Sequence, residues 1–236
     1  MIAVVSEQIP QLAEIRLREL GYRIQKLPPH PALPAPVASH PDMLLFFAPD
    51  AILCTESYLR IATRELTAIA RAVGLPIRPV AQDYGPNYPH DILLNAASIG
   101  KYLFCLPSHT AKEIQAIPQI TLCAVRQGYA KCSTVPVGDH ALITEDPSIA
   151  TAAKAHGLEV LQISPNNVRL PGYDTGFLGG ACSYAPYHDP KELLMCGNLA
   201  LHKEADAILA FLHRNGKKAV LLTDSPLTDV GTVFII

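Results

Sequence analysis

Several common sequence signals are missing from this chain, and each absence excludes a class of protein. Charged residues make up only 17% of the 236 residues and the formal net charge is -2, so nothing points to a nucleic-acid partner. No segment approaches the roughly 18 uninterrupted apolar residues of a membrane helix. The first eight residues contain no basic residue and an early acid, Glu7, which is typical of a first strand rather than a signal peptide. We expect a cytoplasmic protein without nucleic-acid or membrane partners.

Motifs for metals and cofactors are also missing. The six cysteines lack CxxC spacing, and most lie in apolar stretches, which favours reduced, buried thiols over disulfides or a zinc site. The glycine pair Gly179–Gly180 has the spacing of neither a dinucleotide fingerprint nor a phosphate loop. We therefore expect no cofactor and no metal. Because 49% of the residues are hydrophobic, the chain can bury a large core, and we expect one domain over residues 1–236.

Short apolar strands open after five small polar clusters that recur along the chain. The third residues of the clusters lie roughly 40 to 55 residues apart, also when the C-terminus is joined to the N-terminus. A repeat of this length is typical of closed repeat architectures. The clusters are His40-Pro41-Asp42, Pro89-His90-Asp91, Ala130-Lys131-Cys132, Gly172-Tyr173-Asp174 and Leu227-Thr228-Asp229. If the ring closes, four carboxylates and one thiol converge near one axis.

A second pattern agrees with the first. Four helical segments end at a glycine that leads into an apolar strand, as expected for a left-handed residue at a helix C-terminus. These glycines are Gly21, Gly74, Gly157 and Gly216, and Pro118 takes the same place after a weak helix at 109–116. Each unit is thus predicted to run strand, strand, helix, strand.

These patterns predict an α/β fold in which five ββαβ-type repeats form a five-fold pseudosymmetric propeller, closed by pairing of the N- and C-terminal strands. The predicted repeats are residues 1–30 with 227–236, 40–80, 89–125, 130–164 and 172–224. A doubly wound α/β sheet remains an alternative, since alternation of strands and helices alone does not separate the two.

Local signals add detail to these units. Residues 56–73 carry an apolar stripe at helical spacing, Asp146-Pro147 is a helix start, and residues 199–215 are rich in alanine and leucine. The proline-rich segment 22–40 is predicted to be a crossing segment or a flap. Residues 179–190 are predicted to form a loop that covers an opening.

The cluster His40-Pro41-Asp42, followed by Met43-Leu44-Leu45-Phe46, resembles the H-x-D motif of the pentein fold. That family contains guanidino-group-modifying enzymes, including arginine and agmatine deiminases, dimethylarginine hydrolases and amidinotransferases, and also non-catalytic members. The resemblance implies that His40 is a general acid/base and that Asp42 binds a guanidinium. It implies a small cationic guanidino-type ligand, and the architecture covers the whole chain.

The chain departs from this family at the nucleophile. The enzymes carry a cysteine near the C-terminus, typically after a glycine pair. This chain ends Asp229-Val230-Gly231-Thr232-Val233-Phe234-Ile235-Ile236, without a cysteine. Cys132 is the one thiol at a cluster position. Either the site is rotated around the pseudosymmetry, with His40 or His90 serving Cys132, or catalysis has been lost.

The chemistry can also be argued from the residues. A guanidinium is a planar cation with five donors, so its pocket needs carboxylates, and Asp42, Asp91, Asp174 and Asp229 are the candidates. Carboxylates near Cys132 raise its pKa, while Lys131, a histidine or the cationic substrate lowers it. Each aspartate also has a plain interpretation as a turn residue before a strand.

Three functions follow from these candidates. The first is an amidinohydrolase or amidinotransferase-like enzyme acting on a guanidino or related amide compound through Cys132. The second is a carboxylate-dependent metal hydrolase, and the third is a non-catalytic binding protein with the same fold. Asn198, in a segment typical of a strand end and helix cap, is kept as a further substrate-binding candidate. The sequence leaves the oligomeric state open.

Overall fold

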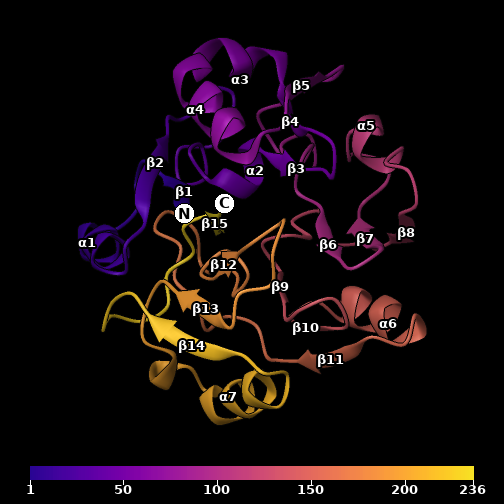
Figure 1. The fold of residues 1–236 in the computed structure, drawn as a ribbon. Coiled ribbons are helices and arrows are strands. Elements are labelled where there is room, and N and C mark those ends of the chain that lie inside the picture. The colour runs from indigo at the N-terminus through magenta and orange to yellow at the C-terminus, as the bar shows by residue number, and fades with distance from the viewer.

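The computed structural model describes all residues 1–236 and contains five small, separate sheets. They lie around the centre of the molecule, and the longer helices lie outside them (Figure 1). The strands therefore form neither one continuous doubly wound sheet nor one closed barrel. No helix combines the length and the apolar composition that crossing a bilayer requires.

The group built on β3 shows how each unit is organised. Strand β3 (Phe46–Phe47) pairs antiparallel with β4 (Ile52–Thr55), and β4 pairs parallel with β5 (Ile77–Val80). The parallel pair requires a crossover, which two helices provide, α3 (Glu56–Ile61) and α4 (Thr63–Val73). The predicted order of strand, strand, helix and strand is thus observed in this unit.

The other units follow the same order. The second consists of β6 (Ala97–Ile99), β7 (Tyr102–Cys105), α5 (Lys112–Gln115) and β8 (Thr121–Ala124). The third consists of β9 (Thr134–Pro136), β10 (Ala141–Thr144), α6 (Pro147–Ala155) and β11 (Glu159–Gln162). The fourth consists of β12 (Ser183–Tyr184), β13 (Glu192–Met195), the 3₁₀ turn η1 (Leu199–Leu201), α7 (Ala205–Arg214) and β14 (Lys218–Leu221).

The last unit joins the two ends of the chain. Strand β15 (Val233–Ile235) pairs antiparallel with β1 (Ile2–Ser6), and β1 pairs parallel with β2 (Arg23–Leu27) after helix α1 (Gln11–Glu19). Strand β12 belongs to the same sheet, because it pairs parallel with β15 and not with β13. Pairing of the N- and C-terminal strands was expected from the sequence and is observed near the centre of Figure 1.

The sequence predicted the ends of the helices better than it predicted whether each helix is continuous. All four predicted terminal glycines have a left-handed backbone, and Asp146 caps α6 through the N–H groups of Ser148 and Ile149. The predicted helix 56–73 is interrupted at Ala62, and 199–215 is divided into η1 and α7. The apolar stripe continues across the break at Ala62, so periodicity alone did not reveal it.

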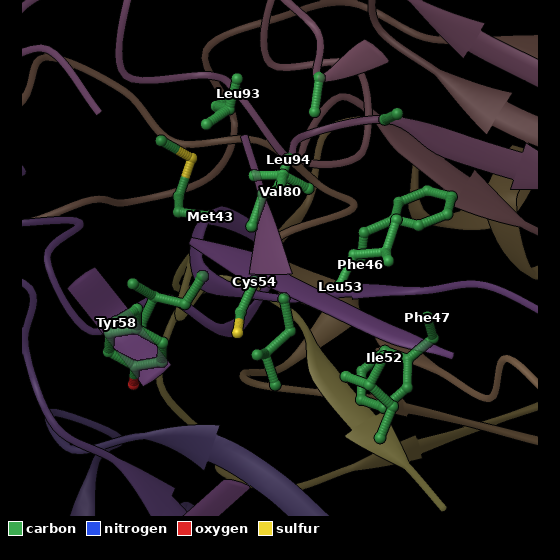
Figure 2. Close-up of a cluster of buried hydrophobic side chains, with 14 of the residues drawn as sticks. Met43, Phe46, Phe47, Ile52, Leu53, Cys54, Tyr58, Val80, Leu93 and Leu94 are labelled. Atoms are coloured by element: carbon green, nitrogen blue, oxygen red, sulfur yellow. The ribbon is translucent and has the colours of Figure 1, made fainter. Parts of the chain in front are cut away.

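The largest hydrophobic cluster contains 33 buried residues and spans several units. Figure 2 shows the part around β3 and β4, where Phe47 and its strand partner Ile52 lie together and Met43 approaches from the preceding turn. Helix α2 (Pro41–Leu44) forms this turn, and all four of its residues are buried. The H-x-D segment is therefore fixed by the core on its apolar side.

We distinguish two ends of the inner strands β3, β6, β9, β12 and β15. At the cluster end the chain enters these strands, and the side chains of Asp42, Asn95, Cys132 and Thr232 meet there. At the hairpin end the chain leaves them, through turns that include Gly100 and Asp139.

Candidate functional site

Cys132 lies at the centre of the cluster end, held by two polar side chains. Its thiol donates to Asp42 Oδ2 at 3.3 Å, and Asn95 Nδ2 donates to its sulfur at 3.0 Å. Asn95 Oδ1 also accepts from the backbone N–H groups of Lys131 and Cys132. One buried amide therefore fixes both the main chain and the thiol of Cys132, against the carboxylate from the H-x-D segment.

Lys131 and Thr232 lie on the other side of Asp42. The Lys131 ammonium donates to Thr232 Oγ1 at 3.0 Å, lies 5.3 Å from the ring centre of Tyr184 and forms no ion pair. The Thr232 hydroxyl lies 2.8 Å from Asp42 Oδ2 and 3.1 Å from the carbonyl oxygen of Gly179. Thr232 has a φ of 67°, a strained conformation for a β-branched residue. The surrounding contacts hold it there.

Asp229 is the second fully enclosed carboxylate of the cluster end. It accepts from the backbone N–H groups of Phe177 and Gly231, and its Oδ1 lies 3.8 Å from His40 Nδ1. The glycine pair passes between Asp229 and the Cys132 backbone, because a Cβ at Gly180 would lie 2.0 Å from Asp229 Oδ1. Gly179 and Gly180 are therefore required because their neighbours leave no room for a side chain. This glycine pair had been assigned to no motif from the sequence.

Asp91 extends the cluster through aromatic side chains. Tyr129 donates its hydroxyl to Asp91 Oδ2 at 2.7 Å, while Asp91 Oδ1 is buried without a partner. The Tyr129 ring lies 5.4 Å from that of Tyr88 and 6.1 Å from that of Phe177. Since Phe177 also donates its N–H to Asp229, Tyr129 and Phe177 connect the two carboxylates.

Burial governs the ionisation of this cluster. Burial raises the pKa of the Cys132 thiol well above its ordinary value, and the nearby Asp42 raises it further. Burial also raises the pKa of Asp42 and raises that of Asp229 to about 6, and it lowers the pKa values of Lys131 and His40. Lys131 is the single buried lysine or arginine of the cluster, which contains the three buried carboxyl groups of Asp42, Asp91 and Asp229. The cluster therefore favours the binding of a further cation or proton.

Glu145 is a fourth buried acid, after Asp42, Asp91 and Asp229. Its Oε1 accepts from the backbone N–H of Leu178, next to the glycine pair. Burial raises the pKa of Glu145 to about 8, so this carboxyl group carries a proton at neutral pH.

Two neighbouring cavities lie toward the hairpin end. A cleft of about 700 Å³ is lined by the turns after the inner strands and by residues 183–190, which agrees with the prediction that segment 179–190 covers an opening. It shares Phe46, Phe47, Ser98 and Tyr184 with a smaller inner cavity of about 10 Å³, where Asp42 and Lys131 form part of the wall.

Three predicted site residues lie outside the cluster. His90 is exposed, and its ring packs 5.1 Å from that of His109. Asp174 is exposed. The loop between Asp174 and its strand β12 is longer than the loop that joins any of the other four cluster residues to its strand. Asn198 caps η1 by accepting from the N–H of Ala200, as its segment indicated. His40, Asp42, Asp91, Lys131, Cys132 and Asp229 are all buried.

Four residues of the cluster were not identified from the sequence: Asn95, Tyr129, Glu145 and Thr232. Asn95 is separated from its cluster by three apolar residues, and Thr232 follows Asp229 by three positions. A signal existed for Thr232, because it follows Gly231 in the C-terminal segment where the family's cysteine was sought. No group of three or more His, Cys, Asp and Glu side chains is arranged to hold a metal ion, and we propose no metal site.

Solved structures with similar folds are enzymes that act on guanidino compounds. Dimethylarginine dimethylaminohydrolase from Pseudomonas aeruginosa, a cysteine-to-serine mutant complexed with citrulline, matches with a TM-score of 0.57, 10% identity, and 94% of this chain and 91% of that chain covered. Agmatine deiminase from C. jejuni matches with a TM-score of 0.52, 12% identity, and coverage of 94% and 86%.

An amidinotransferase of saxitoxin biosynthesis from Microseira wollei matches with a TM-score of 0.50, 12% identity, and coverage of 97% and 93%. At these identities the likeness shows the fold alone. A comparison with curated protein sequences finds no match.

A family model described as a family of unknown function, DUF6873, matches residues 4–234. The chain therefore belongs to the DUF6873 family, and its fold is that of the pentein superfamily.

Proposed function

We propose that this protein is a guanidino-group-modifying enzyme, an amidinohydrolase or amidinotransferase, that uses Cys132 as its nucleophile. One observation carries the proposal: the Cys132 thiol donates to Asp42 in a buried cluster with more carboxylates than cations, where Asp42 Oδ1 has no partner. A guanidinium supplies the missing positive charge and donates to the Asp42 carboxylate. The similar folds of three guanidino-compound enzymes support it.

The bound cation also explains how a thiol with a raised pKa becomes reactive. A positive charge beside Cys132 favours the thiolate and offsets the effect of Asp42. Asp42 and Asp229 bind the guanidinium nitrogens, Asp91 binds a cationic group nearer the surface, and His40 moves a proton between the leaving nitrogen and Asp229. His40 contacts Asp229 rather than Cys132, which suits an acid for the leaving group better than a base for the thiol.

The fold is part of the same proposal. The five strand-strand-helix-strand groups are five repeats related by pseudosymmetry, in one domain over residues 1–236. The repeated order of elements and the pairing of β1 with β15 support this description. The nucleophile Cys132 then belongs to a different repeat from the C-terminal one. Thr232 lies in that C-terminal repeat.

A second candidate is a binding protein of the same fold that holds the cation without turnover. The observation in its favour is that no histidine contacts the thiol, whose pKa is raised in the ligand-free protein. Binding and turnover depend on the same carboxylates, so the two candidates differ only in the reactivity of Cys132.

Alkylation of the six cysteines tests the proposal. The reagents are 2-chloroacetamidine, a cation shaped like a guanidinium, and 2-chloroacetamide, its neutral analogue; both form an S–C bond and release chloride. We expect 2-chloroacetamidine to modify Cys132 at least tenfold faster than 2-chloroacetamide does, as mapped by mass spectrometry, with arginine or agmatine slowing the reaction.

Cys54 and Cys196 provide internal controls, because burial raises the pKa of each to about 12 without a comparable set of carboxylates. Equal modification of Cys132 and these controls by both reagents would rule out the cation site. Selective modification of Cys132 without any turnover of arginine or agmatine would favour the binding protein.

A further inference from the structure

The cleft at the hairpin end shares four lining residues with the inner cavity, whose wall includes Asp42 and Lys131 of the candidate site. It lies on the opposite side of the site from the loops of the cluster end. Tyr184 donates to the carbonyl oxygen of Ser98 at 3.4 Å and Tyr187 to that of Ala48 at 3.1 Å. The segment that follows β12 therefore crosses the hairpin end and narrows the cleft to a junction formed by Phe46, Phe47, Ser98 and Tyr184.

The size of the inner cavity limits what passes this junction. Its volume of about 10 Å³ is the space that one water molecule needs. A guanidinium has four heavy atoms and does not fit. The organic ligand of Asp42 therefore enters elsewhere, past the loops of the cluster end, and only a molecule with one heavy atom reaches Asp42 through the cleft.

The polar groups of the inner cavity define the chemistry of that molecule. Asp42 Oδ1 is a buried acceptor without a partner, and the Lys131 ammonium uses one of its three donors, on Thr232. The occupant must donate to Asp42 and accept from Lys131. Water and ammonia do both, whereas an ammonium ion has no acceptor and would be repelled by Lys131.

We propose that the inner cavity and the cleft form a path for small neutral molecules, by which water reaches the site and ammonia leaves while the ligand fills the cluster end. This proposal depends on hydrolysis of a guanidinium at Cys132. The thiolate sulfur attacks the guanidinium carbon and the C–N bond breaks. The nitrogen leaves as ammonia with its electron pair and the proton lost by the thiol, which His40 delivers.

Water then attacks the same carbon, the C–S bond breaks, and the thiol is restored while a ureido product forms. The proton released in this step passes through His40 and Asp229 to the solvent, where it converts the departed ammonia to ammonium. One molecule of water enters and one of ammonia leaves in each cycle. The inner cavity holds either of them beside Asp42, the carboxylate nearest to the sulfur.

A substitution at the junction tests the path. Ser98→Leu places a bulky side chain where the two cavities meet, and Lys101→Leu, on the outer wall of the cleft, is the matched control. With arginine and agmatine as substrates, we expect Ser98→Leu to lower the rate of ammonia release at least tenfold and Lys101→Leu to change it by less than twofold.

Alkylation of Cys132 by 2-chloroacetamidine needs no water and releases no ammonia, so its rate should stay unchanged in Ser98→Leu. That result also shows that the variant is folded. A high-resolution crystal structure of the wild type should place an ordered molecule between Asp42 Oδ1 and Lys131 Nζ.

The possible failures can be told apart. If the wild type releases ammonia and Ser98→Leu does so equally fast, the path is wrong and the proposed enzyme stands. If Ser98→Leu slows alkylation as much as ammonia release, the substitution damages the site and the path is again refuted. If the wild type releases no ammonia from either substrate, hydrolysis fails and the path fails with it.

Discussion

The buried cluster around Cys132 and the exposed residues His90 and Asp174 come from the same sequence pattern, yet they differ in every physical property. Asp229 is enclosed and accepts two backbone N–H groups, whereas Asp174 is exposed. The difference follows from the loop before the inner strand, which is short for Asp229 and long for Asp174. Repeated spacing therefore predicts the unit in which a residue lies, and the length of the loop decides how deeply its side chain is buried.

Replacing the two aspartates should give the largest contrast. Asp229→Ala leaves the N–H groups of Phe177 and Gly231 without a partner, which should lower the free energy of unfolding by about 3 kcal/mol. Asp174→Ala should change it by less than about 0.5 kcal/mol. Urea denaturation measures both, and similar losses in the two variants would contradict the buried placement of Asp229.

Burial of Glu145 should make the stability of the protein depend on pH. Its folded pKa of about 8 lies above the ordinary 4.5, so the folded state binds more protons than the unfolded state between these values. The stabilisation by Glu145 is complete below pH 4.5 and disappears as the pH rises through 8. We expect the wild type to lose about 3 to 4 kcal/mol more than Glu145→Gln between pH 5 and 8, since one pKa unit corresponds to about 1.4 kcal/mol.

Glu56→Gln serves as the control for this measurement, because Glu56 is exposed at the start of α3. Its stability should follow the wild type at every pH. A curve for Glu145→Gln that runs parallel to the wild type would show that Glu145 is ionised in the folded protein at neutral pH.

Thr232 tests the contact between the last strand and the cluster. Thr232→Val keeps the shape and the strained backbone but removes the hydroxyl that contacts Asp42 and Lys131, at a cost of about 1 kcal/mol. Thr151→Val removes an exposed helix hydroxyl and should have almost no effect. Thermal unfolding compares the two, and equal midpoints would mean that the Thr232 hydroxyl contributes nothing.

His90 should show the smallest effect. Because its side chain is exposed and packs on His109, His90→Ala should change stability by less than about 0.5 kcal/mol. The rate of Cys132 alkylation by 2-chloroacetamidine should change by less than twofold. A loss of tenfold or more in that rate would show that His90 takes part in the reaction at Cys132.

The order of elements was predictable because local rules fix it. Glycine at a helix end, proline at a helix start and alternating apolar segments depend on a few neighbouring residues. The break at Ala62 was not predictable, since both halves of 56–73 are good helix and only packing against the core ends the first one.

The cluster itself was predictable only in part. The spacing of the clusters singled out Asp42, Cys132 and Asp229. The contact between Asp42 and Thr232 joins residues that are 190 positions apart in the sequence. Asn95 was missed because an asparagine after an apolar run resembles an ordinary turn residue. Its role depends on reaching Lys131 and Cys132 from a different unit, which no local pattern encodes.

Titration with matched ligand pairs tests the central claim most directly. Arginine and citrulline, or agmatine and N-carbamoylputrescine, differ at the group that we place on Asp42, a guanidinium in one and a neutral ureido group in the other. Calorimetry should show at least tenfold tighter binding of the guanidinium compound of one pair, and Asp42→Asn should abolish that preference. Equal affinity within both pairs, or a preference that survives Asp42→Asn, would contradict the account.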